Sequence, residues 1–124
     1  MRTNGEIRAY LFEQLKANYA LWSYDKSTMT ADTLTDEQII EKVLMHLDMD
    51  DINILFLLFP KERIKEVWKW NLCALEFYYS SNVLFAGLFF NIKNPPRYVK
   101  MQAQRIVRNN LKGHNHARSI AQNI

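Results

Sequence analysis

The stretch Leu72–Ile92 reads LCALEFYYSSNVLFAGLFFNI, and its one charged side chain is Glu76. It is about as long as a membrane span, but its Ser and Asn residues and Glu76 favour the core of a small helical domain instead. Because Ser and Asn prefer helix caps to helix interiors, the run Tyr78–Asn82 predicts a break between two helices. Gly87, in the second of them, predicts close approach of a neighbouring helix.

The composition around this stretch is typical of a small helical protein. A chain of 124 residues fits one domain. Its three Gly and three Pro are too few for an all-β protein, which needs frequent turn residues. No apolar signal segment follows the first residues, and the single cysteine fits a reducing compartment. We therefore expect a cytoplasmic, all-α, single-domain bundle of five or six short helices.

Two capping patterns predict the first helices. Thr3–Glu6 places a hydroxyl three residues before a carboxylate, which predicts a helix over about 4–20. Thr35–Gln38 repeats the pattern and predicts a helix over 36–47. The apolar residues that follow each pattern recur at helical spacing. They are Ile7, Leu11 and Leu15 in the first helix, and Ile39, Ile40, Val43, Leu44 and Leu47 in the second.

The acidic turn Asp48–Asp51 separates the second helix from a short apolar run. It lacks the length, the Gly and the bidentate Glu of a calcium loop, so we expect Asp50 or Asp51 to cap the next helix. Pro60 then fits the start of an amphipathic helix over 61–71. Its expected buried face comprises Ile64, Val67, Trp68 and Asn71.

The prolines of Asn94-Pro95-Pro96 predict a stiff corner before the last helix. That helix is expected over 97–112, with Gly113 as the residue that ends it. The domain would then span 1–113, followed by a flexible tail over 114–124. Helical spacing places Val99, Ala103, Ile106 and Val107 on the face that docks onto the domain.

The charges divide the chain into two halves. Residues 1–76 contain nine Lys and Arg and all thirteen Asp and Glu, whereas residues 77–124 contain seven Lys and Arg and no acid. The net charges are therefore −4 and +7, an asymmetry that suggests a basic arm for an acidic partner. The candidate binding residues on the last helix are Arg97, Lys100, Arg105, Arg108 and Lys112.

This basic stripe has three interpretations that the sequence leaves open. It could contact phosphates of a nucleic acid without reading its sequence. It would equally serve an acidic protein surface. It could also be a solvated helix face with no partner. Two aromatic residues, Trp22 and Tyr24, stand before the polar segment 26–34, either as packing anchors or as partner-facing side chains.

Motifs for catalysis are missing from the sequence. It contains no Gly-rich phosphate loop, no His-Glu-x-x-His and no Ser-centred elbow. His114 and His116 lack further metal ligands nearby, and Cys73 stands among apolar residues as a small hydrophobe. We therefore predict no catalytic residue, no metal site, no cofactor and no enzymatic activity.

The pattern from Leu21 to about Met101 resembles a family of short bacterial helical proteins of unknown function. The shared features are Leu21–Asp25, the helix Glu37–Leu44, the segment Ile64–Val67, and Leu88–Ile92 before prolines. Members of that family look like neighbours of AbiEii-type nucleotidyltransferase toxins. The resemblance implies a bacterial, antitoxin-like protein that binds a partner protein, with a toxin as that partner. Nucleic-acid binding through the basic helix is the alternative.

Overall fold

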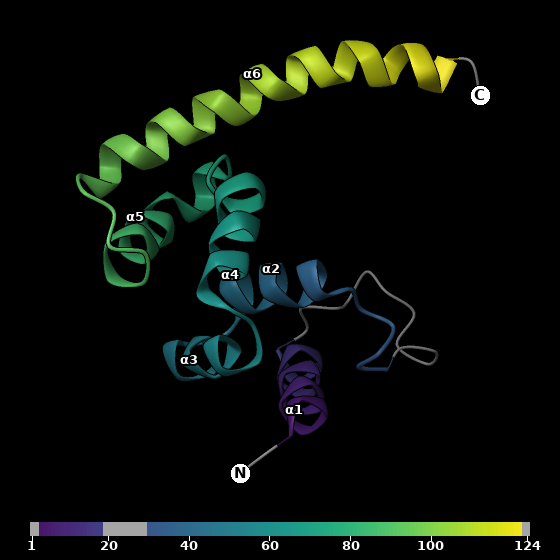
Figure 1. The fold of residues 1–124 in the computed structure, drawn as a ribbon, viewed down its shortest axis with the longest axis vertical. Helices are drawn as coiled ribbons and strands as arrows, with labels where there is room; N and C mark the ends of the chain where they lie inside the picture. The colour runs from purple at the N-terminus through teal and green to yellow at the C-terminus, as the bar shows by residue number, and fades with distance from the viewer. Residues whose placement is uncertain (1–2, 19–29, 123–124) are drawn as a thin grey trace. The chain divides into compact units, whose positions relative to one another are not determined.

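The protein is all-α, as its sequence predicts. The computed structural model describes residues 3–18 and 30–122, although the side chains of 112–122 lie outside that description. Within this part of the chain there are six α-helices and no strand (Figure 1). Their bounds are α1 (Asn4–Ala17), α2 (Asp36–His46), α3 (Met49–Leu58), α4 (Lys61–Val67), α5 (Tyr79–Leu88) and α6 (Pro95–Gln122). A π-helical turn, η1 (Trp68–Leu72), and a 3-10 turn, η2 (Glu76–Tyr78), lie between α4 and α5.

Contacts along the chain divide it into two compact units. Unit 1 is Met1–Trp68 and contains α1 to α4, whereas unit 2 is Lys69–Ile124 and contains α5 and α6. The boundary falls inside η1, so the domain predicted over 1–113 spans unit 1 and the larger part of unit 2. Each unit is described by itself below.

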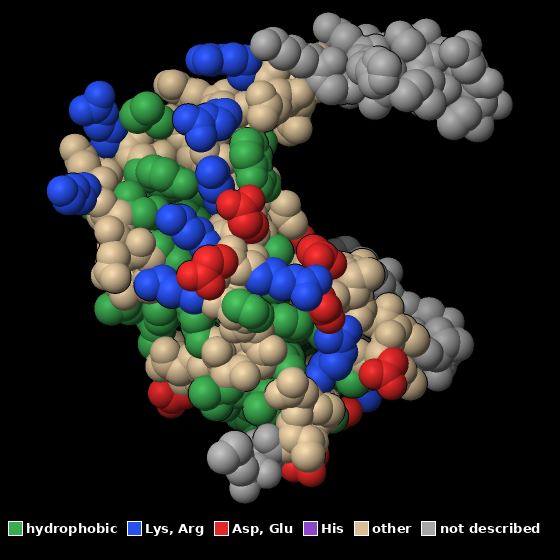
Figure 2. Space-filling view, in the orientation of Figure 1, with side chains coloured by type: hydrophobic (Ala, Val, Ile, Leu, Met, Phe, Trp, Pro, Cys, Tyr) green, Lys and Arg blue, Asp and Glu red, His purple; other side chains and the backbone are tan. Residues whose placement is uncertain are grey.

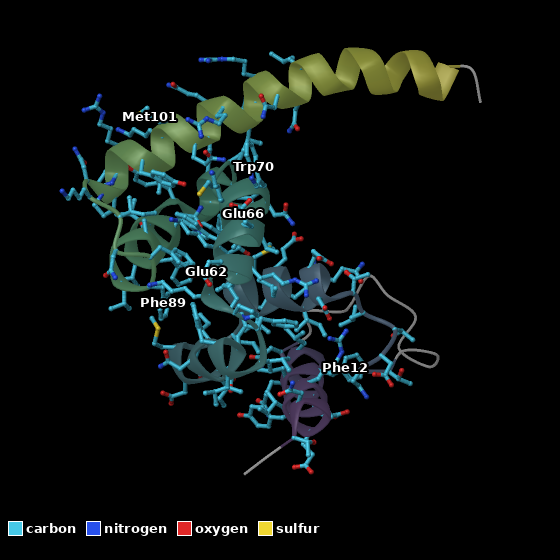
Figure 3. All side chains as sticks on the ribbon, viewed as in Figure 1. Phe12, Glu62, Glu66, Trp70, Phe89 and Met101 are labelled. Atoms are coloured by element: carbon cyan, nitrogen blue, oxygen red, sulfur yellow. The ribbon has the colours of Figure 1, made fainter. Side chains whose placement is uncertain are left out.

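In unit 1, α1 begins as its capping pattern predicts. The Thr3 hydroxyl accepts a hydrogen bond from the Glu6 backbone N–H at 3.2 Å. The predicted apolar positions are buried, and Phe12, labelled in Figure 3, is buried beside them. The helix ends at Ala17 instead of the predicted residue 20. The backbone and side-chain N–H groups of Asn18 both donate to the Gln14 carbonyl, so Asn18 caps one carbonyl of the last turn.

The caps of α2 and α3 show one case in which a short sequence pattern predicts the capping residue correctly and one in which it does not. Thr35 and Gln38 form the complete capping box, with N–H···O distances of 2.8 and 3.1 Å. The cap of α3 is Asp48, not Asp50 or Asp51, because Asp48 accepts the Asp51 N–H at 3.0 Å. Asp51 is instead buried, where it accepts a hydrogen bond from the Tyr10 hydroxyl at 2.8 Å. It thereby joins α1 to α3.

The helix expected over 61–71 is two elements. The α-helix α4 ends at Val67, and the chain winds on as the wider turn η1 to Leu72. The predicted buried residues Ile64, Val67 and Trp68 are buried, but Asn71 is exposed. A π turn adds a residue to each hydrogen-bonded ring and rotates later side chains away from the α-helical face.

In unit 2, the break inside the apolar stretch lies earlier than predicted. The chain leaves helix at Cys73 and Ala74, passes through η2, and enters α5 at Tyr79. The break predicted at Tyr78–Asn82 is therefore placed too late, because Tyr79–Asn82 form the first turn of α5. Asn82 is fully buried there, and its side-chain amide donates to the Leu72 carbonyl at 2.8 Å. The polar side chain thus caps the end of η1 and does not interrupt α5.

The corner between α5 and α6 explains why a glycine fits at position 87. A Cβ at that position would lie 3.3 Å from Cγ of Pro95, so the predicted close approach is confirmed. Asn91 and Asn94 adopt the left-handed conformation, with φ of 50° and 51°, which Asn tolerates better than most residues. Phe89, labelled in Figure 3, places its ring 5.7 Å from that of Phe85. The corner therefore packs α6 closely against α5.

The last helix is longer than the sequence predicts. It begins at Pro95, where a missing N–H costs nothing, and it continues through Gly113 to Gln122. The predicted end at Lys112 is therefore wrong, while the flexibility predicted from residue 114 stays a prediction. A glycine inside a helix costs about 1 kcal/mol, and no proline follows it to stop the helix.

A candidate partner-binding groove in unit 2

Unit 2 contains a groove of about 710 Å³ along α6. One wall is the segment from η1 to α5, and the other is the face of α6 that turns toward it. The lining residues of the first wall are Cys73, Ala74, Leu75, Glu76 and Tyr79. Those of α6 are Val99, Lys100, Ala103, Gln104, Val107, Arg108 and Leu111. This volume falls within the roughly 300–1,000 Å³ of ligand-binding sites in proteins.

The first half of α6 holds the helix in place. Val99 and Ile106 are buried as predicted, and Gln102 is buried between them. The Gln102 side-chain amide donates to the Lys69 carbonyl at 3.1 Å, which satisfies one backbone group of η1. Arg105 in turn donates to Gln102 Oε1 at 3.4 Å. This end of the groove is therefore built on a fixed, hydrogen-bonded helix.

The second half of the groove exposes apolar side chains. Val107, predicted to dock onto the domain, is 54% exposed, and Leu111 is 62% exposed. They stand four residues apart and so lie on one face of α6. Helical spacing found the correct face, but beyond Ile106 the described part of unit 2 covers that face only partly. Phe77, which follows Glu76 in η2 but does not line the groove, is 91% exposed.

The structure brings together only part of the predicted basic stripe. Arg97, Lys100, Arg105 and Arg108 are all exposed. Lys100 and Arg108 line the groove, whereas Arg97 and Arg105 lie on α6 outside its lining. Lys112 continues the same helix, in the part whose side chains are not described. Figure 2 shows Lys and Arg side chains gathered over the described part of α6 with apolar side chains between them.

Three cations of α6, Arg97, Lys100 and Arg108, form no ion pair within the part of the chain that the structure describes. Unit 2 contains eight Lys and Arg but a single acidic residue, Glu76. The positive electrostatic potential of these side chains therefore acts on the solvent and on molecules that approach the groove.

Sequence reasoning missed Glu76 and Tyr79 as groove residues. Glu76 begins η2 and is exposed on the wall that faces α6. The sequence did contain one indication that Glu76 is unusual, because it is the last acidic residue of the chain and interrupts an apolar stretch. Its place opposite Lys100 and Arg108 depends on how the chain turns at Cys73–Leu75, and nothing local predicts that turn.

Cys73 lies at the base of the groove and is buried. Burial raises the pKa of its thiol to about 12, against a smaller opposite effect of Lys69. The thiol is therefore protonated at neutral pH and a poor nucleophile. This agrees with the expectation of a small, inert hydrophobe.

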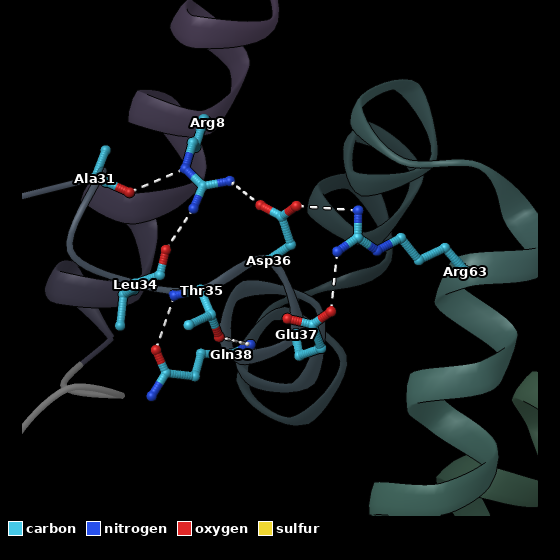
Figure 4. A network of polar contacts seen from close by, with 8 residues as sticks. All are labelled: Arg8, Ala31, Leu34, Thr35, Asp36, Glu37, Gln38 and Arg63. Carbon is cyan, nitrogen blue, oxygen red and sulfur yellow. Dashed lines mark hydrogen bonds and ion pairs between the residues drawn. The ribbon is translucent and has the colours of Figure 1, made fainter.

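Unit 1 uses its charges differently, in the network of Figure 4. Arg8 on α1 pairs with Asp36 Oδ1 at 2.6 Å, and Arg63 on α4 pairs with Asp36 Oδ2 at 3.0 Å. Arg8 also donates to the Ala31 carbonyl at 3.0 Å and to the Leu34 carbonyl. One carboxylate at the start of α2 thus ties α1 and the preceding loop to α4.

Glu37 completes this network by pairing with Arg63 at 2.9 Å. The hydrogen bond from Arg63 is the main cause that lowers the pKa of the Glu37 carboxyl. The same bond raises the pKa of Arg63. These groups hold unit 1 together, and their charges are already paired.

Other candidate sites give less. No group of three or more His, Cys, Asp or Glu that could hold a metal ion occurs in residues 3–18 and 30–122. The predicted partner-facing aromatics Trp22 and Tyr24 lie outside the described residues. No helix in the described part of the chain combines the length and apolar character that a membrane crossing needs.

Comparison of the chain with models of protein families, with curated proteins and with solved structures finds no match. The resemblance to the bacterial helical family therefore stays a prediction. The case for function rests on the groove itself.

Proposed function

We propose that this chain is a non-enzymatic interaction protein that binds a partner protein in the groove of unit 2. The observation that supports this most is the exposed pair Val107 and Leu111 at the open end of an apolar groove. Water-exposed apolar side chains that lie together, rimmed by polar ones, are typical of interaction sites. Covering them with a partner would stabilise the complex by about 25 cal/mol for each Å² of apolar surface buried.

The rim indicates the charge of that partner. Lys100 and Arg108 flank the apolar lining, and the net charge of unit 2 is +7. Complementary charge accelerates encounter and selects the correct partner more than it adds affinity. We therefore propose an acidic protein as partner.

The family resemblance adds an antitoxin-like role in a bacterial cytoplasm, with a toxin as the partner. Co-expression with the products of adjacent genes tests this role directly. We expect one of them to slow growth alone, and this chain to restore growth and to form a complex with it. A growth defect that persists despite full expression of this chain would reject the antitoxin-like role.

The groove requires its own test in that complex. Val107→Asp with Leu111→Asp should abolish complex formation, because two carboxylates replace exposed apolar contacts. Met101→Asp is the matched control, since Met101 is 50% exposed on α6 but does not line the groove (Figure 3). Equal binding by the double variant and the control would show that the partner uses another surface.

Nucleic-acid binding is the second candidate function. Arg97 and Arg105 favour it, because they are exposed on α6 outside the groove and pair with no carboxylate of the described residues. Binding of a labelled DNA duplex or an RNA strand should then weaken steeply with salt. Arg105→Ala with Arg108→Ala should reduce that salt dependence, whereas Lys16→Ala with Lys61→Ala in unit 1 should not. Absent or salt-independent binding would exclude this function.

A further inference from the structure

We infer that the groove receives the apolar face of an acidic amphipathic helix, which lies along α6. This inference rests on the proposed function, since it names the form of the protein segment that the groove binds. The lining positions on α6 run from Val99 to Leu111. At 1.5 Å per residue they span about 18 Å, which matches a partner helix of about three turns.

The shape of the groove favours a helix over other peptide forms. Its α6 wall presents residues that recur every three or four positions, as in the ridges that pack into the grooves of a second helix. Addition of a peptide strand needs an open sheet edge, and residues 3–18 and 30–122 contain no strand. A polyproline segment needs a groove lined with aromatic rings, whereas Tyr79 is the one aromatic residue in this lining.

The charges select the sequence of that helix. Lys100 and Arg108 stand eight residues apart on α6, which separates them by about 12 Å along the axis. A partner helix that carries carboxylates about two turns apart, beside its apolar face, can approach both. The described part of unit 2 offers these cations no ion pair, so the partner does not have to displace one.

A second copy of α6 is a poor occupant of the same groove. The helix carries six Lys and Arg and no Asp or Glu. Pairing it with itself would place Lys100 and Arg108 of one chain against like charges of the other, which is destabilising. The occupant is therefore a different segment, and its charge is opposite to that of α6.

Glu76 adds a second charge requirement for the partner helix. It is the single acid of unit 2, and it lies on the wall opposite α6. A partner carboxylate that faces this wall is repelled, whereas a Lys or Arg there is attracted. The groove thus favours a helix with acids toward α6 and a basic residue toward η2, so the helix is held in one rotational setting.

Synthetic helical peptides test the inference with the full chain. The probe is a 14-residue peptide with Leu at positions 3, 7, 10 and 14, Glu on the flank toward α6 and one Lys on the other flank. Its counterparts have the Glu and Lys exchanged, or the Leu scrambled. We expect the first peptide to bind at least tenfold more tightly than either counterpart, as measured by fluorescence anisotropy at low salt.

Variants of this chain then locate the peptide. Val107→Asp with Leu111→Asp should abolish binding, and Met101→Asp should leave it unchanged. Glu76→Gln should reduce the preference for the peptide with Lys over one with Gln at that position. Equal binding of the acidic and exchanged peptides would overturn the inference, as would dimers of this chain that lose Val107 and Leu111 exposure without any peptide.

Different experimental results would reject the helix inference and the proposed function. If no helical peptide binds, but Val107→Asp with Leu111→Asp still disrupts the complex with a partner protein, the helix inference is wrong and the proposed function stands. If the double variant leaves that complex intact, the groove is not the binding surface and both fall.

Discussion

The two units treat their charges in opposite ways. In unit 1, Asp36 and Glu37 pair with Arg8 and Arg63, and the carboxylates and cations neutralise one another within about 3 Å. In unit 2, eight cations share one acid, and the apolar residues of α6 continue past the surface that could bury them. Charge that is paired internally serves the fold. Charge and apolar surface that are left open together are available to a partner, and for this reason we propose that the binding site lies in unit 2.

The largest expected effect comes from one substitution made in both units. Leu11 of α1 is fully buried, so Leu11→Ala should destabilise the protein by about 2–5 kcal/mol. Leu111 of α6 is 62% exposed, so Leu111→Ala should change stability by no more than about 0.5 kcal/mol. Urea unfolding followed by circular dichroism measures both. A large loss for Leu111→Ala would show that its side chain is already covered, and would contradict the open groove.

The buried amide of Asn82 should rank second. Asn82→Ala removes one of the two hydrogen bonds to the Leu72 carbonyl, the other being donated by the Leu75 N–H, and it opens a cavity at a fully buried site. Together these losses should cost about 1–3 kcal/mol. Ser80→Ala, two residues earlier on the exposed side of α5, is the control and should be nearly neutral. Thermal unfolding compares the two, and equal melting temperatures would show that Asn82 does not fix the start of α5.

The network of unit 1 should contribute less. Asp36→Asn removes the charge that joins Arg8 to Arg63, and partial exposure limits the expected cost to about 1 kcal/mol. Asp32→Asn, in the exposed loop before α2, is the matched control. The difference between the two variants should shrink in 1 M NaCl because salt screens exposed pairs. A cost that salt does not change would indicate a packing role for Asp36.

The smallest expected effect is the pH dependence of Glu37. Its pKa is lowered in the folded protein, chiefly by the hydrogen bond from Arg63. The unfolded chain therefore binds more protons as pH falls, so this stabilisation is present above about pH 4.5 and is lost below it. Glu37→Gln should flatten the acid side of the stability profile. In an Arg63→Ala background the same substitution should change nothing, and a persistent change would assign the effect to another group.

Local patterns predicted what local contacts determine. The capping box of Thr35 and Gln38 was predictable because both partners lie within one turn. The role of Asn82 was not, since its partner is the carbonyl of Leu72, ten residues away around an irregular turn. Asp51 was likewise assigned to a cap, while its actual partner is Tyr10 on another helix.

The candidate site was predictable in kind but not in place. Charge counting identified the acid-free segment and its basic residues, and helical spacing identified the inner face of α6. Periodicity cannot show where the surface opposite a helix ends, so Val107 was expected to be buried and is exposed. Glu76 entered the groove only through the fold of the turn before η2.

The contact between Gly87 and Pro95 has a mechanical consequence. The helix α6 has 28 residues, so it is a rod of about 42 Å whose first residue, Pro95, packs against Gly87 of α5. A rotation of about 5° at that pivot moves the far end of such a rod by about 4 Å. A methyl group at position 87 would press on Pro95 from 3.3 Å. Gly87 has no reactive side chain, yet its small size allows the contact with Pro95 that fixes the direction of α6.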